Sequence, residues 1–589
     1  MTIEKRIDGI DFTIDTGAQS VDFDVTSTKG EAGVKLFRLK ASFTAATSPE
    51  KISVTFYVKK DDAATTFKPN EILNAGIRPD WNPSPAFSSA ACGAPVIAAV
   101  TKNDKNKVTV ALSDCKTPCA LSLGFNEPRQ KLTVRVELFT ALVSPIKEYE
   151  TKLRVDFRDE TADKTIADVR GWWKNFYRSA SAYLPEAAEL PCYAPWYVFQ
   201  QRFTDETLIE QCRLAKALGM ETIIVDDGWQ TEDNGGGYSY CGDWRVCKSK
   251  IADMAEFVKI VHAIGMKVML WFSVPYMGKN AKAADDFRGK YLYFDGGIGA
   301  YALDPRFSKV REYLTGIYAE FLNKYDLDGF KLDFIDAFYL TADSPKNYDD
   351  MDYVSLSDAV EALIGEVTDE LRRIKPDVML EFRQRYTGAV MQQFGNMFRV
   401  GDCAGDENTL KTCVADLRML TSGVAVHSDP LIWSYDDAVE YAAYQLNHSI
   451  FGVPQISLNL KNITDEHRRM LAYYLAYFRE NRKTLLNGRL RAEGFSHGYT
   501  ALTATGEEKD VTSLYGTSIV DFSGDKSLDV INAASERTAY IRVKRETEVA
   551  IKITDCKGDV VSERTVNLSA GLNEIDVPVS GFAFIRLQK

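Results

Sequence analysis

Hydrophobic and polar positions alternate through the first part of the chain, which is typical of β-strands with one face in a core. Apolar residues occupy every second position of 52–58, with Ser53, Thr55 and Tyr57 between them, and 132–138 repeat the pattern. Clusters of Asn, Pro and Ser, such as 82–85, separate these runs. We therefore predict an N-terminal β-sandwich over 1–165, followed by an aromatic-rich linker at 166–190.

After residue 190 the pattern changes to short apolar runs separated by helical stretches. The first helical stretch has Thr204 as a candidate N-cap, apolar residues at helical spacing and Gly219 at its end. Eight apolar runs are candidate strands: 193–198, 222–226, 267–272, 329–334, 378–382, 397–401, 424–427 and 455–458. Eight βα units over 191–487 predict a (β/α)8 barrel. A doubly wound open sheet is the alternative, but no GxGxxG follows any of these strands.

Alternation returns in the last hundred residues, as in 549–553, with turn residues at 557–559 and 569–571. This pattern predicts a smaller C-terminal antiparallel β-domain over 488–589. The expected architecture is α/β: a central (β/α)8 TIM barrel flanked by an N-terminal β-sandwich and this C-terminal domain.

Composition narrows the classes of function. Hydrophobic residues are 45% and charged residues 26% of the chain, which is ordinary usage for a soluble globular protein. The formal net charge of −12 disfavours nucleic acid and anionic membranes as partners. No run reaches 18 apolar residues and the first residues lack an apolar signal segment, so we expect a cytoplasmic protein.

Cysteine and histidine spacing gives no sign of a metal site. The chain has 10 Cys without a CxxC pair and 5 His without HExxH spacing. We expect free thiols in a reducing compartment, no metal and no cofactor. The sequence does not determine whether the chain forms a homo-oligomer.

Acidic residues gather where the predicted barrel strands end. They are Asp226 and Asp227 after the second strand, Asp333 after the fourth, Asp402 after the sixth and Asp429 after the seventh. In such a barrel the active site lies at these strand ends. Clustered acids without His or Cys leave two chemistries: an oxygen-ligand metal site, or paired carboxylates acting on a glycosidic bond.

The two carboxylates of the second chemistry need different protonation states. Lys331 lies two residues before Asp333 and on the same side of the strand, where it would keep Asp333 ionised as a nucleophile. An ordinary salt bridge at a strand end is the alternative interpretation. Burial and neighbouring acids would raise the pKa of Asp402, which suits an acid/base. Asp406 on the same loop is a rival for that role.

The adjacent acids Asp226 and Asp227 repel each other unless something donates hydrogen bonds to both. Vicinal sugar hydroxyls would do so, with Trp229 or Trp271 as an apolar platform for a pyranose ring; a divalent cation is the alternative. His427 is either a sugar ligand or a satisfied buried histidine.

Two arginines near these acids have two interpretations. Arg383 and Arg399 are expected to brace carboxylates, because arginine forks match carboxylate geometry. Contact with a charged substituent on the sugar is the alternative.

Five short motifs together resemble glycoside hydrolase family 36, the melibiase-like α-galactosidases. They are DDGW at 226–229, GDW at 242–244, LWF at 270–272, LDP at 303–305 and KLD at 331–333. They occur in the family's order and rough spacing, and the resemblance covers about 191 to 486. It implies a retaining double displacement without a metal, with Asp333 as nucleophile and Asp402 as acid/base. It also implies that Asp226, Asp227 and Lys331 hold the hydroxyls of the non-reducing sugar.

The chain departs from the family pattern at three places. Segment 381–386 replaces a Cys- and Gly-rich loop, 273–275 replace Glu-Pro-Glu, and Leu332 replaces a tryptophan. The segment 399–403 also resembles the acid/base strand of family 31 α-glucosidases and α-xylosidases. These departures bear on which sugar is accepted, especially at carbons 2 and 6.

The sequence as a whole predicts a retaining exo-acting α-glycosidase, in the first place an α-galactosidase acting on an oligosaccharide or small α-glycoside. The alternatives are an α-glucosidase or α-xylosidase, an α-galactosyl transglycosylase, a divalent-metal hydrolase, and a carbohydrate-binding protein on a decayed barrel.

Overall fold

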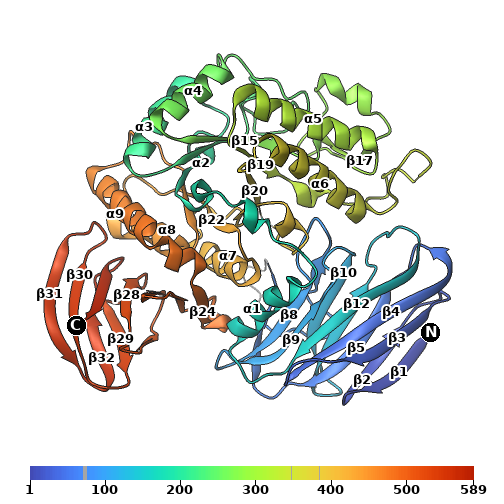
Figure 1. Cartoon of the computed structure of the whole chain (residues 1–589), viewed down its shortest axis with the longest axis horizontal. Helices are drawn as coiled ribbons and strands as arrows, with labels where there is room; N and C mark the ends of the chain where they lie inside the picture. The colour runs from blue at the N-terminus through green and yellow to red at the C-terminus, as the bar shows by residue number, and fades with distance from the viewer. Residues whose placement is uncertain (70–75, 347, 384, 589) are drawn as a thin grey trace.

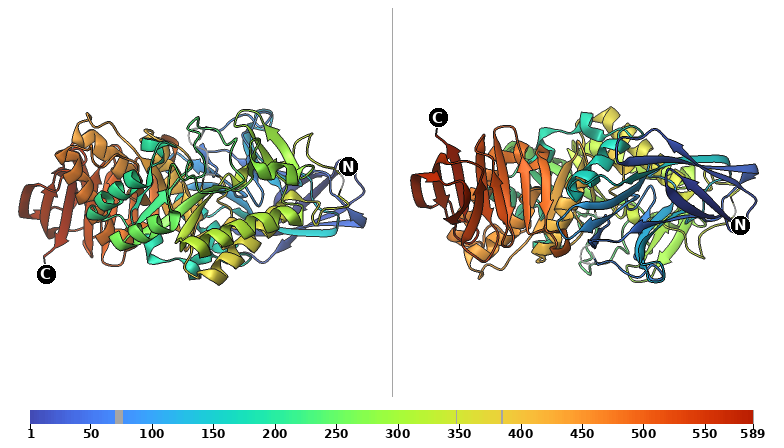
Figure 2. Two further views of the ribbon diagram at one scale, coloured as in Figure 1. Left: turned by 90° about the horizontal axis from the view of Figure 1, so that it is seen from above. Right: turned by 90° about the horizontal axis from the view of Figure 1, so that it is seen from below.

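The structure is a computed structural model that describes residues 1–69, 76–346, 348–383 and 385–588. A closed barrel lies between two regions of β-sheet, with the N-terminal sheets in blue and the C-terminal sheets in red at opposite ends of the long axis (Figures 1 and 2). This is the predicted architecture.

The N-terminal region consists of two six-stranded sheets packed face to face, as predicted. One has the order β1-β2-β5-β11-β10-β7 and the other β3-β4-β12-β9-β8-β6. Alternate apolar residues of both sheets fill the core between them, as in β5, where every second residue is buried. The strands are β1 (Thr2–Ile7), β2 (Ile10–Asp15), β3 (Asp22–Thr28), β4 (Val34–Thr47), β5 (Ile52–Lys59), β6 (Ala63–Phe67), β7 (Ala86–Ser88), β8 (Val96–Thr101), β9 (Asn106–Leu112), β10 (Cys119–Asn126), β11 (Lys131–Leu138) and β12 (Ile146–Asp156).

The segment between the sandwich and the barrel is helical. It contains α1 (Ala162–Trp173) and the 3-10 helices η1 (Ala180–Tyr183) and η2 (Glu186–Glu189). The buried face of α1 contacts strands β8 and β9 and helix α7. This segment therefore packs the sandwich against the barrel.

Eight parallel strands close the barrel, and each matches one of the eight predicted runs. The strands are β13 (Cys192–Tyr193), β14 (Thr222–Val225), β15 (Lys267–Ser273), β19 (Gly329–Asp333), β20 (Met379–Arg383), β21 (Met397–Arg399), β22 (Ala425–Leu431) and β23 (Val453–Ile456). Parallel strands covered by helices are buried on both faces, which is why they appear as continuous apolar runs. The first strand is shorter than predicted, because Pro195 lacks an N–H for the ladder and starts helix α2 (Trp196–Phe199).

Helices cover the outside of the barrel. They are α3 (Asp205–Ala217), α4 (Met254–Ile264), α5 (Ser308–Tyr325), α6 (Leu356–Ile374), α7 (Glu407–Leu420), α8 (Val439–Ser449) and α9 (Asp465–Arg482). Short helices lie in the connections between elements: η3 (Lys282–Phe287), η4 (Ile335–Ala337), η5 (Met391–Gln393), η6 (Lys483–Asn487) and, between the first two strands of the C-terminal region, η7 (Phe495–His497). Helix α3 begins as predicted, with the Thr204 side chain accepting from the Thr207 N–H at 3.3 Å. A small antiparallel sheet of β16 (Tyr276–Gly278), β17 (Tyr291–Asp295) and β18 (Ala300–Leu303) follows β15.

The C-terminal region has a seven-stranded and a three-stranded sheet. Its strands are β24 (Arg489–Glu493), β25 (Ala501–Thr505), β26 (Lys509–Leu514), β27 (Ile519–Phe522), β28 (Ser527–Asn532), β29 (Thr538–Val543), β30 (Thr547–Thr554), β31 (Val560–Leu568), β32 (Gly571–Asp576) and β33 (Phe582–Leu587). Most pairings are antiparallel as predicted, but β26 pairs with β28 and β27 with β29 in parallel. The strand that lies between the two members of each pair in the sequence belongs to the other sheet. The chain therefore re-enters the first sheet running in the same direction as before.

Two predictions about side chains and membranes can be checked on the fold. All 10 cysteines lie in described residues and are free thiols, as predicted. Within the described ranges, no helix combines the length and the apolar character needed to span a membrane.

Candidate active site

Five barrel strands carry charged side chains to one end of the barrel. Asp226 follows β14, Asp333 ends β19, Arg383 ends β20, Asp402 follows β21 and Asp429 lies on β22. Parallel strands end at the same rim, so residues that are up to 203 positions apart in the numbering come together there. The structure thus places the predicted acids in one cluster.

Three donors fix the carboxylate of Asp333, which is 4% exposed. The Trp271 indole N–H donates to Oδ2 at 2.9 Å, the Phe334 backbone N–H donates to Oδ1 at 2.7 Å, and Arg383 Nε forms an ion pair with Oδ1. The prediction that Lys331 is the cation beside Asp333 is wrong. Lys331 instead donates to Asp226 Oδ2 at 2.6 Å, across the end of the barrel from the end of β14, which is separated from β19 by β15.

Two guanidinium groups hold Asp402, whose side chain is 56% exposed. Arg399 Nη2 is 2.8 Å from Oδ1, and Arg383 Nη1 is 3.1 Å from both oxygens. Burial raises the pKa of Asp402, but the positive charges of Arg399 and Arg383 outweigh it and hold this pKa well below its usual range. The predicted upward shift is therefore wrong for the unliganded protein, since arginines rather than acids surround the carboxylate.

Arg383 is the centre of this arrangement. Its Nε contacts Asp333 while its Nη1 contacts Asp402, and the guanidinium lies over the Phe334 ring, 4.6 Å from the centroid. One buried side chain thus bridges the two candidate catalytic carboxylates. The prediction that Arg383 and Arg399 brace carboxylates is confirmed.

Behind the two carboxylates lies a buried layer of charges. Arg399 forms an ion pair with Asp429 and lies 3.9 Å from Glu381. Asp429 also accepts from the Tyr197 hydroxyl and the Cys403 N–H, each at 2.8 Å. Burial raises the pKa of Asp429 to about 6. This layer fixes Arg399, and Arg399 in turn fixes Asp402.

The adjacent acids Asp226 and Asp227 are satisfied by protein donors. Asp227 accepts from Gln230 at 2.6 Å and from Gln201 at 2.7 Å, and Asp226 accepts from Lys331. Burial raises the pKa of Asp227 to about 6. The repulsion between the two acids, which the sequence left to a sugar or a cation, is relieved within the protein.

Gly228 lets Gln201 reach this acid pair. Its φ is +115°, and a Cβ at this position would lie 2.8 Å from the Gln201 Cα. A larger residue would therefore push away the segment that carries one of the two donors to Asp227.

The tryptophans do not form the predicted platform. Trp229 has 0% exposure and packs against Trp244 and Phe272 in the core, so its predicted role as a substrate contact is wrong. Trp271 is 1% exposed and contributes its N–H to Asp333 rather than an open face. The partly exposed ring next to the site is Tyr238, stacked on Trp271 with centroids 5.8 Å apart.

Two further predicted contacts have structural roles. His427 is fully buried; its Nε2 is 2.8 Å from the Ala188 carbonyl and its Nδ1 is 3.2 Å from Gln455, so it is the satisfied buried histidine and not a sugar ligand. Asp406 caps helix α7 by accepting from the Thr409 N–H at 3.0 Å. The cap explains why an acid stands at this position in the loop after β21.

Sequence reasoning missed three residues near the acids. Gln201 and Tyr238 lie in loops, where no strand period marks them, and Tyr197 lies in helix α2, within a run that was predicted as a strand. Gln230 could have been found, because it lies three residues after Asp227 at a tight turn. Among the described residues, no group of three His, Cys, Asp or Glu side chains is arranged to hold a metal ion.

Comparisons with known proteins agree with this geometry. The family model described as melibiase matches residues 162–333. The bifunctional α-galactosidase/sucrose kinase AgaSK of Mediterraneibacter gnavus is 34% identical over 80 residues, 13% of this chain and 8% of that protein. The α-galactosidase Mel36A of Lactobacillus acidophilus is 36% identical over 81 residues, 13% of this chain and 10% of that protein. These matches span a tenth or less of the relatives' own length.

A solved structure extends the likeness to nearly the whole chain. The family 36 α-galactosidase AgaA of Geobacillus stearothermophilus superposes with a TM-score of 0.66 at 13% identity, covering 98% of this chain and 82% of that one. At this identity the likeness establishes the fold. Residues 162–333 therefore match the melibiase family model, within a chain that has the fold of the family 36 α-galactosidases.

Proposed function

We propose that the protein is a retaining α-galactosidase that removes terminal α-galactosyl residues from oligosaccharides. The observation that carries the proposal is the pair of carboxylates, Asp333 and Asp402, brought from two strands to one side chain, Arg383, at the carboxyl end of a barrel. The melibiase match across the strand that ends in Asp333 supports the choice of sugar.

In the proposed mechanism Asp333 attacks the anomeric carbon and Asp402 protonates the departing glycosidic oxygen. A glycosyl ester on Asp333 forms, and Asp402 then takes a proton from the water that releases the sugar. Three donors to Asp333 keep its oxygens in one position, which favours attack along one line. Retention requires the two carboxyl groups to be about 5–5.5 Å apart in the working enzyme, against about 6.5–9.5 Å for inversion.

The low pKa of Asp402 in the unliganded site has to rise before it can donate a proton. We infer that an entering pyranose takes the space beside Arg383 and draws its Nη1 away from Asp402, while the aglycone covers the exposed side of that carboxylate. Loss of one positive neighbour and loss of water both raise a carboxyl pKa. Substrate binding would thus prepare the acid.

The non-reducing sugar is held by the charged groups beside the nucleophile. Asp226, Asp227 and Lys331 are fixed by their own hydrogen bonds before substrate arrives, so little ordering is needed on binding. Tyr238 offers the ring face that the tryptophans do not. Variants of Geobacillus AgaA have been solved with raffinose and with stachyose, and we propose oligosaccharides of this kind as substrates.

The test is hydrolysis of aryl α-galactoside, α-glucoside and α-N-acetylgalactosaminide by the wild type and Asp333→Ala. We expect cleavage of the galactoside, a loss of about 10³-fold or more in the variant, and α-galactose as the first product by NMR. Preferred cleavage of the glucoside would contradict the α-galactosidase assignment and favour an α-glucosidase activity of the family 31 type. Product analysis at high acceptor concentration distinguishes a transglycosylase.

Other outcomes would overturn the proposal. Wild-type activity in Asp333→Ala would show that Asp333 is not the nucleophile. Release of β-galactose as the first product would show that the reaction inverts the anomeric configuration. Saturable sugar binding without turnover of any substrate would indicate a binding protein.

A further inference from the structure

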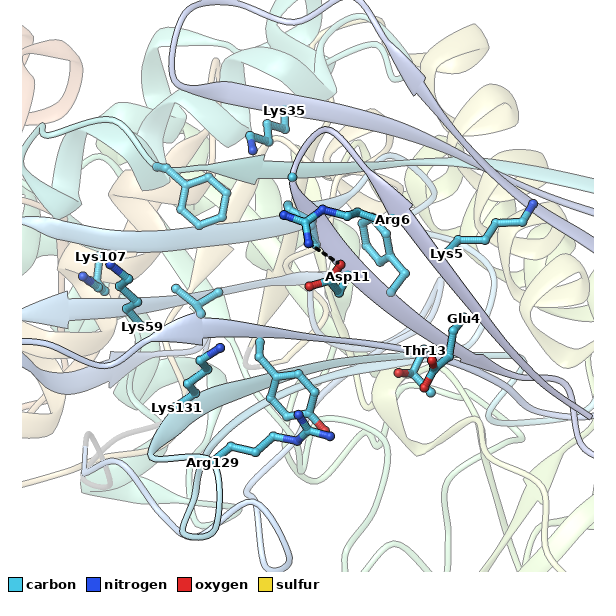
Figure 3. Close-up of a pocket in the computed structure, with 16 residues that line it drawn as sticks. Glu4, Lys5, Arg6, Asp11, Thr13, Lys35, Lys59, Lys107, Arg129 and Lys131 are labelled. Carbon is cyan, nitrogen blue, oxygen red and sulfur yellow. Dashed lines mark ion pairs between the residues drawn. The ribbon is translucent and has the colours of Figure 1, made fainter.

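The N-terminal sandwich has a large cavity at one end, distant in sequence from every residue of the barrel site. Its volume is about 970 Å³, near the upper end for small-molecule sites. Seven of its sixteen lining residues are Lys or Arg and two are Asp or Glu, in a chain of net charge −12. The basic side chains line it from several strands and one turn: Figure 3 labels Lys35, Lys59, Lys107 and Lys131 on strands, and Arg129 in the turn between β10 and β11.

The cavity forms where one sheet splits. Strand β2 pairs with β5 only from Thr13 to Asp15, opposite Thr55 to Ser53. Residues 10–12 of β2 and 57–59 of β5 no longer pair with each other, although they still pair with β1 and β11, and both segments line the cavity. Lys35 and Lys107 come from β4 and β9 of the facing sheet. The space therefore opens between the two sheets as well as within one.

Two lysines in this cavity lie directly opposite each other. Lys59 on β5 is the cross-strand partner of Lys131 on β11. Like charges at opposed positions destabilise a sheet, and among the described residues neither lysine has an ion-pair partner. By contrast Lys5, Arg6 and Lys107 pair with Asp24, Asp11 and Asp61. The electrostatic attraction between Lys59 and Asp61 offsets part of this repulsion, and an anion outside the chain is the group that would compensate the pair further.

Aromatic rings lie among these charges. The Arg129 guanidinium lies over the Tyr57 ring at 4.5 Å, and Lys35 lies over Phe157 at 5.7 Å. Flat rings beside fixed cations suit a ligand that has both apolar ring faces and negative groups. Acidic sugars have both features. The negative charge of the whole chain disfavours nucleic acid, which would meet repulsion beyond the cavity.

We propose that this cavity, here called the basic cleft and lined by Lys35, Lys59, Lys107, Arg129 and Lys131, binds an acidic oligosaccharide. Carboxylate and sulfate groups supply the same chemistry, so uronate and sulfated chains are both covered. The site is independent of Asp333 and Asp402. It would hold an anionic glycan on the protein whatever sugar the barrel cleaves.

The test is calorimetric binding of four probes: galacturonate oligomers, sulfated galactan oligomers, neutral galactan oligomers and single-stranded DNA. The variant is Lys59→Gln with Lys131→Gln. We expect the wild type to bind one or both acidic glycans and the variant to bind them about tenfold more weakly, as two exposed ion pairs allow. Binding should weaken with salt. Which acidic probe binds identifies carboxylate or sulfate as the recognised group.

The matched control removes two lysines of the same sandwich that have acidic partners. Lys51 pairs with Glu137 at 2.9 Å and Lys40 with Glu148 at 3.3 Å, both outside the basic cleft. Lys51→Gln with Lys40→Gln changes net charge equally and should leave binding unchanged. The cleft variant should keep its Tm, since it relieves a repulsion, and should keep hydrolysis of the aryl galactoside.

Three results would overturn the proposal. They are neutral glycan or DNA bound as tightly as the acidic glycans, no binding of either acidic probe by the wild type, and equal losses in the cleft and control variants. Because the readout is binding, a protein that cleaves no α-galactoside could still pass this test.

Discussion

Replacing Arg383 by methionine should move the alkaline limb of the pH profile of kcat/KM upward. The side chain has similar length but no charge, so it removes one cation from Asp333 and from Asp402 together. Asp402 then loses part of what favours its ionised form, and its pKa rises. In the proposed mechanism the alkaline limb reports Asp402.

The size of the shift follows from the geometry at Asp402. A charge pair about 4 Å apart interacts by about 4 kcal/mol at an effective dielectric constant of 20. The Asp402 side chain is 56% exposed, and exposed pairs contribute about 1 kcal/mol or less. Arg399 stays in place at 2.8 Å. A value between these limits, about 1.4 kcal/mol, corresponds to about one pKa unit on the alkaline limb.

The assay is kcat/KM for an aryl α-galactoside against pH, with Arg385→Met as control. Arg385 is two residues further on and pairs with Asp336 at 3.3 Å, so its loss should leave the alkaline limb in place. A uniform loss of rate in Arg383→Met, without movement of the alkaline limb, would refute the assignment of Arg383 as a group that lowers the pKa of Asp402. An equal shift in the control would do the same.

Three further predictions concern residues around the site. Lys331→Met leaves Asp226 buried without its cation and should lower the free energy of unfolding by about 3–5 kcal/mol. Adding Asp226→Asn should recover most of this loss, as measured by thermal unfolding. A double variant with no recovered stability would contradict the Lys331–Asp226 pairing. Asp406→Ala should cost about 1 kcal/mol of stability as a lost cap and keep kcat within a few-fold; a loss as large as that of Asp402→Ala would make Asp406 the acid. Burial lowers the pKa of His427 from 6.5 to about 4, so its contribution to stability is present above 6.5 and is lost as pH falls toward 4. His427→Gln should flatten the fall in Tm over that window, and an unchanged slope would show that His427 is not its source.

The strand pattern and the strand-end acids could be predicted from the sequence because both depend on local order. A strand buried on two faces needs an apolar run, and a residue such as Asp333 at the end of one must lie at the rim of a barrel. The eight runs and the gathering of acids were predicted correctly for this reason. The capping role of Asp406 is also set by local sequence, since an acid that accepts from the backbone N–H three residues later is a common N-cap. Its place near Asp402 nevertheless led to the prediction of a catalytic role.

Which charges meet could not be predicted, because partners across a barrel come from different strands. Lys331 was assigned to Asp333 by the period of its own strand, whereas closure of the barrel brings Asp226, at the end of the non-adjacent strand β14, within 2.6 Å. The pKa of Asp402 was predicted in the wrong direction, since sequence neighbours are acids while spatial neighbours are Arg383 and Arg399. Whether an aromatic ring is exposed also depends on the tertiary structure. Trp229 follows the acid pair along the chain, but its side chain is buried in the core.

The sequence by itself therefore determined the order of the elements, the barrel and the end of it where chemistry gathers. The tertiary structure alone decided the pairing of charges, the protonation they favour, and the opposition of Lys59 and Lys131 in the basic cleft. The physical reason is range. Apolar periodicity acts between residues a few positions apart, whereas electrostatic and hydrogen-bond partners are selected by distance in space, which closure of the barrel and of the sheets sets.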